Sequence, residues 1–271
     1  MTTSTKATVN GVDFRLLLEG KADVQAIADI LERAMAVYKD FDFAKKLECV
    51  VFFRNRQDFT DFYASEYGLK DEYSDEGHAI HYPYGTKSII GVGIVDGMTE
   101  MLLTHELGHA IEHDKLKRDG ANYEAWKGRD GYIAWSEFFC QAHASYGQRS
   151  DETKDFYLTY YPEILKNRVE MFNQDNIDRT FLYTIYSMSD LFYHVHTDNT
   201  EAIDYYLEHY ASICSWEFTD FYKTLYDELD AYLRRNGFRY DIAHDYKFFE
   251  RLERYKEDFT DFFKEKEKKS L

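Results

Sequence analysis

The scarcity of helix-breaking residues constrains the fold of this chain more than any other feature. Its 271 residues include only two prolines, and Leu, Ala, Glu and Lys are abundant in long uninterrupted stretches. Proline is the strongest helix breaker because it lacks an amide hydrogen and clashes with the preceding turn. The sequence therefore predicts a mostly helical protein, long enough for one large domain or two smaller ones.

Apolar periodicity and turn residues place the individual elements. Short apolar runs predict strands, and apolar residues spaced three or four apart predict helices. The expected elements are a strand at Val9–Leu18, a helix from Val24 to Tyr38, a strand at Leu47–Phe53, a helix at Asp58–Tyr67 that Gly68 ends, a hairpin or irregular strand within Ala79–Val95, and helices at Met98–Leu116 and Tyr132–Tyr146. Aromatic-rich helices are expected from Asp151 onward, with turns near Asp198–Thr200 and Asn236–Gly237. The fold class is thus α+β with a small mixed sheet, divided into a part at residues 1–150 and a helical part at 151–271.

Charge and composition exclude several classes of partner. The formal net charge is −17, so most of the surface would repel a phosphate backbone, and nucleic-acid binding is not expected. No stretch approaches the roughly 18 apolar residues that a membrane span needs, and residues 1–10 carry no apolar signal segment. We therefore expect no membrane partner and a cytoplasmic location. The three cysteines are far apart and odd in number, which argues against a disulfide framework.

The strongest chemical motif is His105-Glu106-Leu107-Gly108-His109, which has the form HExxH. Two histidines one helical turn apart point the same way and can reach one metal ion. Neutral imidazoles suit Zn²⁺, and zinc lowers the pKa of a bound water towards about 7. The motif predicts that His105 and His109 bind zinc and that Glu106 is the general base.

A catalytic zinc site needs a third protein ligand. His113 lies one further turn along the same helix, about 5.4 Å too far for a metal that His105 and His109 already share. Glu137 is preferred because it is the lone carboxylate of an apolar segment, where an uncompensated charge would be costly. A structural salt bridge or a capping role is the alternative for Glu137. Two other candidates fit less well, the solvated Glu124 and the differently oriented His143.

The motif and the segment Trp135-Ser136-Glu137-Phe138-Phe139, with Gln141-Ala142, resemble the gluzincin group of zinc metallopeptidases. Within that group the match is to peptidase-MA-like and anthrax-lethal-factor-like enzymes, over roughly residues 52–146. The resemblance implies a zincin-like domain, Zn²⁺ on His105, His109 and Glu137, and peptide-bond hydrolysis. It also implies that the strand at Ser88–Val95 lines the substrate cleft and pairs with an extended peptide.

The same resemblance bears on the residues around the metal. Lethal-factor-like enzymes carry a Tyr shortly before the ligand Glu, which implies that Tyr132 stabilises the developing oxyanion. Packing against Trp135 is the alternative for Tyr132. The thermolysin branch has an Asp four residues after the ligand Glu, where this chain has Gln141. The acceptor for the second nitrogen of each ligand histidine is therefore open among Gln141, Glu112, Asp114 and main-chain oxygens.

The sequence thus predicts a zinc peptidase whose partner is a peptide or protein substrate, and it leaves the oligomeric state open. The main alternative is a zinc-binding regulatory or interaction protein that keeps a non-catalytic zincin fold. A toxin or effector that acts inside another cell, and an enzyme acting on small molecules, are further alternatives. Other histidines are interpreted as structural: His78 and His81 beside a strand, and His194 and His196 in a turn with Asp198.

Overall fold

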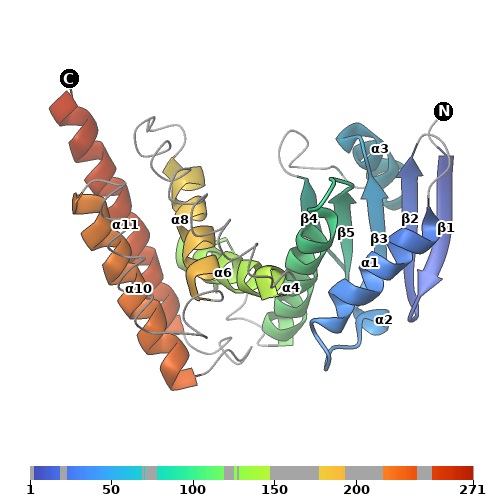
Figure 1. Cartoon of the computed structure of the whole chain (residues 1–271), viewed down its shortest axis with the longest axis horizontal. Coiled ribbons are helices and arrows are strands. Elements are labelled where there is room, and N and C mark those ends of the chain that lie inside the picture. Colours follow the sequence, from blue (N-terminus) through green and yellow to red (C-terminus); the bar gives the residue numbers. More distant parts are fainter. Residues whose placement is uncertain are drawn as a thin grey trace. The chain divides into compact units, whose positions relative to one another are not determined.

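The chain is an α+β protein in which helices predominate (Figure 1). The computed structural model describes residues 3–18, 23–68, 70, 78–118, 125–126, 128–146, 177–192, 216–236 and 246–270. It divides into two compact units, Met1–Arg118 and Asp119–Leu271. The sequence predicts a boundary between the two parts at residue 150. Because the structural boundary follows Arg118, the helix expected at Tyr132–Tyr146 belongs to the second unit. That the first part is catalytic stays a prediction.

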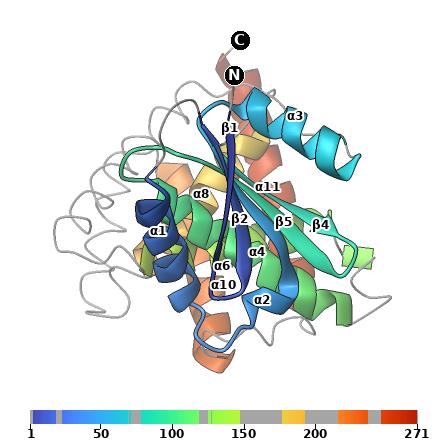
Figure 2. The ribbon, with the colours of Figure 1, turned by 90° about the vertical axis from the view of Figure 1, so that its right-hand side faces the viewer.

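The first unit contains a five-stranded mixed sheet in the order β1-β2-β3-β5-β4. β2 pairs with β3 and β3 with β5 in parallel, whereas β1–β2 and β5–β4 are antiparallel. The strands twist relative to one another, as is usual for pleated sheets (Figure 2). Their bounds are β1 Thr3–Val9, β2 Val12–Leu18, β3 Leu47–Phe53, β4 Ala79–Tyr84 and β5 Lys87–Gly93. The predicted small mixed sheet is confirmed.

The N-terminal strand prediction was wrong at its start. The sequence analysis expected one strand from Val9 to Leu18, but β1 and β2 form a hairpin whose turn is Asn10–Gly11. Both turn residues have positive φ, 49° and 80°. Asn-Gly is the sequence that such a two-residue hairpin turn favours, because both positions adopt the left-handed region. The sequence thus contained the Asn-Gly turn signal. The start of β1 was missed because residues 3–6 are all polar and show no alternation of polar and apolar side chains.

The second hairpin corrects the expectation about the substrate strand. β5 lies between β3 and β4, so both of its edges are paired. The edge strand on this side of the sheet is β4. Ile89, Ile90 and Val92 of β5 are fully buried, as in a central strand, whereas Pro83 of β4 is exposed. A proline has no amide hydrogen for a ladder, and it is therefore confined to edge strands. The Ser88–Val95 segment thus cannot pair with an added peptide.

Helices cover both faces of this sheet. α3 packs on one face, where Phe59 and Tyr63 join a cluster that includes Leu17, Val51 and Ile89. A Cβ at position 91 of β5 would meet the Phe59 ring at 2.7 Å, so this central strand needs a glycine there. α1 contacts α4, and α4 contacts β4 and β5. The helices are α1 Val24–Ala36, α2 Phe43–Lys46, α3 Arg56–Tyr67 and α4 Thr99–Arg118.

The second unit, over its described residues, is helical. Its helices are α6 Asp130–Tyr146, α8 Ile177–Leu191, α10 Trp216–Asn236 and α11 Tyr246–Ser270. α6 packs against both α8 and α11. Large aromatic side chains fill its core, among them Trp135, Phe138, Tyr222, Tyr232 and Phe248. Many of the aromatic residues that the structure describes in this unit thus fill its core.

Polar contacts tie α11 to the start of α6. Arg129 Nε donates to Glu253 Oε1 at 3.1 Å. Lys256 Nζ lies 2.7 Å from Asp130 in the first turn of α6 and 2.8 Å from Asp178 in the first turn of α8. One ammonium group thus holds the beginnings of two helices. None of the helices in the described part of the chain has the length and apolar character that crossing a membrane requires.

Candidate metal centre

The helix that carries HExxH is fixed to its surroundings in the first unit. α4 begins at Thr99, whose hydroxyl accepts a hydrogen bond from the Val95 amide at 3.0 Å. The Tyr38 hydroxyl donates to the Thr104 carbonyl oxygen at 2.9 Å, next to His105. The further anchors are the ion pairs Arg33–Glu100 at 2.7 Å and Lys46–Asp114 at 2.5 Å. The motif therefore lies on a helix with fixed ends.

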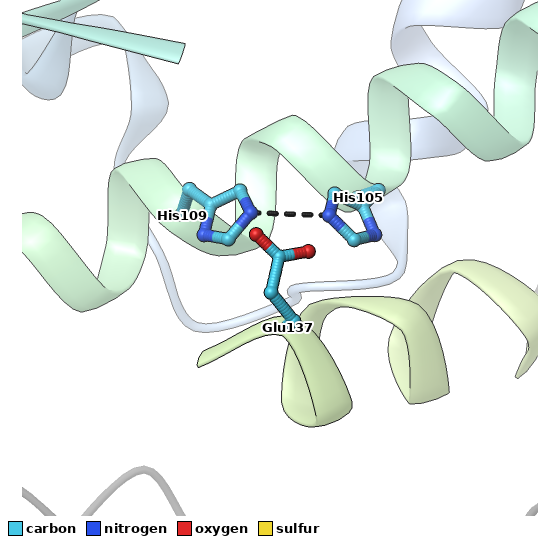
Figure 3. Close-up of side chains that lie close together, drawn as sticks. All are labelled: His105, His109 and Glu137. Carbon is cyan, nitrogen blue, oxygen red and sulfur yellow. Dashed lines mark hydrogen bonds between the residues drawn. The ribbon is translucent and has the colours of Figure 1, made fainter. Parts of the chain in front are cut away.

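The two motif histidines face each other within α4. Their Nε2 atoms are 3.0 Å apart and share a hydrogen bond, drawn as the dashed line in Figure 3. Zn–N bonds of about 2.0–2.1 Å in a tetrahedral site would set two ligand nitrogens about 3.3 Å apart. Both imidazoles are half-buried, and Glu106 between them in sequence is 8% exposed. The two histidines thus point the same way, as their separation by four residues predicts.

Glu137 belongs to the same group of potential ligands. The ligand atoms of His105, His109 and Glu137 all lie within 4.8 Å of one another, and the Glu137 carboxylate is directed at the imidazoles (Figure 3). Two imidazole nitrogens and one carboxylate oxygen form the donor set of many catalytic zinc sites. The described residues therefore fit a divalent metal such as zinc.

A residue that the sequence analysis missed holds Glu137. The Tyr186 hydroxyl of α8 donates to Glu137 Oε2 at 2.7 Å. Nothing in the sequence singles Tyr186 out, because it is one of 24 tyrosines and lies 49 residues from its partner. Only the packing of α8 on α6 reveals the pair.

Tyr132, the predicted oxyanion donor, lies in the first turns of α6 and is half-buried. Its ring makes an edge contact with Phe249, with 5.7 Å between centroids, and packs against the aromatic core. This packing agrees with the structural alternative for Tyr132, although the contact is with Phe249 and α11. Its role in stabilising an oxyanion stays a prediction.

His81 on the edge strand faces α4. Its Nε2 hydrogen-bonds Ser88 Oγ at 2.8 Å, and its ring lies 6.2 Å from that of His109 and 5.7 Å from that of His113. Burial, with a smaller contribution from the two neighbouring histidines, holds the pKa of His81 well below its usual range. The Ser88 hydrogen bond agrees with the interpretation as a structural histidine, and His81 is half-buried and faces α4.

The environment of His109 contains a second carboxylate. Glu112 Oε2 lies 3.6 Å from His109 Nδ1, and the Glu112 side chain is only 5% exposed. A carboxylate near the second nitrogen of a ligand histidine orients the ring and raises its basicity. Glu112 is thus nearer to this role than Asp114, which pairs with Lys46. His109, Glu112 and Cys140 also form a second group whose ligand atoms lie within 4.8 Å of one another.

The structure describes some of the remaining candidate metal or substrate residues. His113 is buried, and the His143 ring packs at a tilt against Phe139, with 4.5 Å between centroids. Neither histidine belongs to a potential metal group of the described residues. His78 is exposed at the start of β4. Four candidates lie outside the described residues: Glu124, His194, His196 and Asp198.

Comparison with known proteins adds no relative to this picture. A scan against protein-family models, a search of curated proteins and a search of solved structures each found no match to this chain.

Proposed function

We propose that this chain is a zinc-dependent peptidase of the gluzincin type, with a zincin-like fold in which His105, His109 and Glu137 hold Zn²⁺. The observation that carries the proposal is the pair of imidazole nitrogens on α4, 3.0 Å apart, with the buried Glu106 beside them. The Glu137 carboxylate completes a three-ligand set. Such a set leaves one position for water, which distinguishes catalytic from structural zinc sites.

The chemistry follows from the residue types. Zinc, when bound, supplies a Lewis acid that polarises the scissile carbonyl and lowers the pKa of water. The Glu106 carboxylate takes the proton from the attacking water and delivers it to the leaving amine. Glu106 suits this role because its burial keeps its carboxylate from being fully hydrated. A hydrogen-bond donor for the oxyanion is also needed, and Tyr132 is the candidate that the resemblance supplies.

The sheet supports a peptide as the substrate class. β4 is an edge strand, and α4 packs against β4 and β5. An extended peptide can add to such an edge through main-chain hydrogen bonds. His81 places an imidazole between this strand and the motif helix, 6.2 Å from the His109 ring. We propose that the substrate pairs with β4, and no longer with the strand at Ser88–Val95.

The test of the base is Glu106→Gln. The amide cannot accept the proton from water, so peptide cleavage should fall by roughly 10²–10⁴-fold. Zinc should remain bound at one ion per chain, measured by elemental analysis after gel filtration. Glu100→Gln is the matched control, because Glu100 lies on the same helix but pairs with Arg33. A zinc-loaded Glu106→Gln protein that cleaves peptides at the wild-type rate would refute the assignment.

The substrate class needs a separate experiment. An unbiased peptide library, incubated with the protein with and without a chelator, should yield chelator-sensitive cleavage products. Mass spectrometry of the products then gives the residues around the cleaved bond. If no peptide is cleaved although zinc is bound, the peptidase proposal fails and only a metal-binding role survives.

One observation favours a second candidate function, a non-catalytic zinc protein with a regulatory or interaction role. Cys140 is fully buried, and with Glu112 it offers His109 an alternative set of metal ligands. Structural zinc sites close all four positions with protein ligands, often with thiolates. Cys140→Ser separates the two functions: it should weaken a structural site strongly and leave zinc binding by the peptidase site unchanged.

A further inference from the structure

Tyr186 contacts the proposed metal ligand Glu137. It lies on α8, is half-buried, and donates its hydroxyl hydrogen to Glu137 Oε2 at 2.7 Å. This distance is typical of a short hydrogen bond from a hydroxyl to a carboxylate. An ionised carboxylate has about four lone-pair sites, so it can accept this hydrogen bond and bind a metal ion at the same time.

The position of Tyr186 is fixed by its own helix. One turn further along α8, the buried Ser189 hydroxyl hydrogen-bonds the Phe138 carbonyl oxygen at 2.8 Å, directly after Glu137 in sequence. On the opposite side, Ser187 Oγ lies 3.0 Å from the Tyr222 hydroxyl, which ties α8 to α10. α8 is therefore held in register with α6 at the point where Tyr186 meets Glu137.

We propose that Tyr186 is a positioning residue, whose hydroxyl holds the Glu137 carboxylate in the orientation in which it can bind the metal. The inference rests on the proposed zinc site, and it names a residue that sets the affinity of that site. A glutamate side chain has three rotatable bonds, and fixing them beforehand removes an entropic cost from metal binding. Partners of this kind typically contribute roughly 10–100-fold to metal affinity.

A merely structural role is the competing explanation. In that case Tyr186 satisfies a half-buried carboxylate and stabilises the contact of α8 with α6, and its removal lowers stability without changing the metal site. The two explanations differ in their effect on metal affinity and on the coordination geometry. Catalytic activity alone would not separate them.

The experiment compares Tyr186→Phe with Tyr183→Phe in the full-length protein. Tyr183 is the matched control because it lies on the same helix, one turn earlier, and is also a partly buried tyrosine beside the core. Zinc affinity is measured by competition with a chromophoric chelator, and the visible absorption of the Co²⁺-loaded protein reports the coordination geometry. We expect Tyr186→Phe to bind zinc roughly 10–100-fold more weakly and to shift the cobalt bands. Tyr183→Phe should resemble the wild type in both measurements.

A double-mutant cycle strengthens the assignment. In a Glu137→Ala background the tyrosine has no side-chain acceptor at position 137, so adding Tyr186→Phe should change the zinc affinity by less than about twofold. If Tyr186→Phe does not fold, Tyr186→Gln and Tyr186→Leu replace it. The glutamine amide can donate a hydrogen bond and the leucine cannot, so the glutamine variant should bind zinc more tightly.

The possible failures are distinguishable. If the wild-type protein takes up no zinc, both the proposed function and the role of Tyr186 are overturned. If the wild type binds one zinc ion and Tyr186→Phe matches Tyr183→Phe in affinity and cobalt spectrum, only the role of Tyr186 is overturned.

Discussion

At the scale of single residues, spacing along the chain predicted what lies on one helix. His105 and His109 could be paired because residues four apart share a helix face, and their Nε2 atoms do meet at 3.0 Å. Glu137 was identified from the cost of burying a lone carboxylate. Tyr186 could not be found in this way, and the contacts of His81 could not be predicted, because they depend on how α8 and β4 pack. Residue spacing does not encode that packing.

His143 provides a pH-dependent test at this scale. Burial lowers the pKa of His143 to about 4, from an ordinary value of 6.5. Between these values the unfolded chain binds a proton that the folded chain does not, so folding stability falls as the pH drops from 6.5 towards 4. The loss contributed by this group is at most about 1.4 kcal/mol for each pH unit.

The check on His143 is urea unfolding of the wild type and of His143→Gln between pH 7 and pH 4. The difference in the free energy of unfolding between the two proteins should change with pH in the window where His143 titrates in the unfolded chain. Titrating carboxylates affect both proteins equally, so they cancel in this difference. A difference that is constant with pH would contradict a buried neutral imidazole.

At the scale of elements, most helices and strands were predictable because the period of the apolar residues and the residues that end helices indicate the same elements. α3 ends where Gly68 indicated, with Gly68 in the left-handed region. Two features were missed for a shared reason. The β1 strand and the central place of β5 depend on pairing between segments, and the apolar pattern of one strand does not specify its neighbours.

Gly131 tests the close approach of α6 and α11. A Cβ at this position would collide with the main-chain oxygen of Phe249 on α11. Helix propensity alone predicts that Gly131→Ala stabilises the protein by about 1 kcal/mol. The collision predicts the opposite sign, a loss of roughly 1–3 kcal/mol or more from overpacking. The urea midpoint of the variant decides between them, and an unchanged or higher midpoint would contradict the close approach.

At the scale of the whole molecule, the dominant property is negative charge. The formal net charge is −17, and a large net charge destabilises a compact state by self-repulsion. Each of the two units has buried apolar side chains of its own, which offset this repulsion. Length fits one large domain or two smaller ones, so it leaves the number of units open, and apolar periodicity does not place a boundary after Arg118.

Salt should therefore stabilise this protein. Raising NaCl from about 0.01 M to about 0.3 M shortens the screening length from ~30 Å to below ~10 Å. At pH 7 the urea midpoint should rise, because repulsion among the excess carboxylates is screened. At pH 5, close to the sequence pI of about 5.0, the same salt step should have little effect. Equal responses at both pH values would show that net repulsion does not limit stability.

Pro83 limits how far the sheet can be extended by another chain. It lies in the edge strand β4, one residue from the end at Tyr84. An incoming strand would find no amide donor at Pro83, so continuous pairing is restricted to the stretch before it. Two copies of this protein are thereby prevented from joining their sheets along all of β4, which is a common defence against aggregation. If the proposed peptide substrate pairs with β4, its continuous pairing is therefore limited to Ala79–Tyr82.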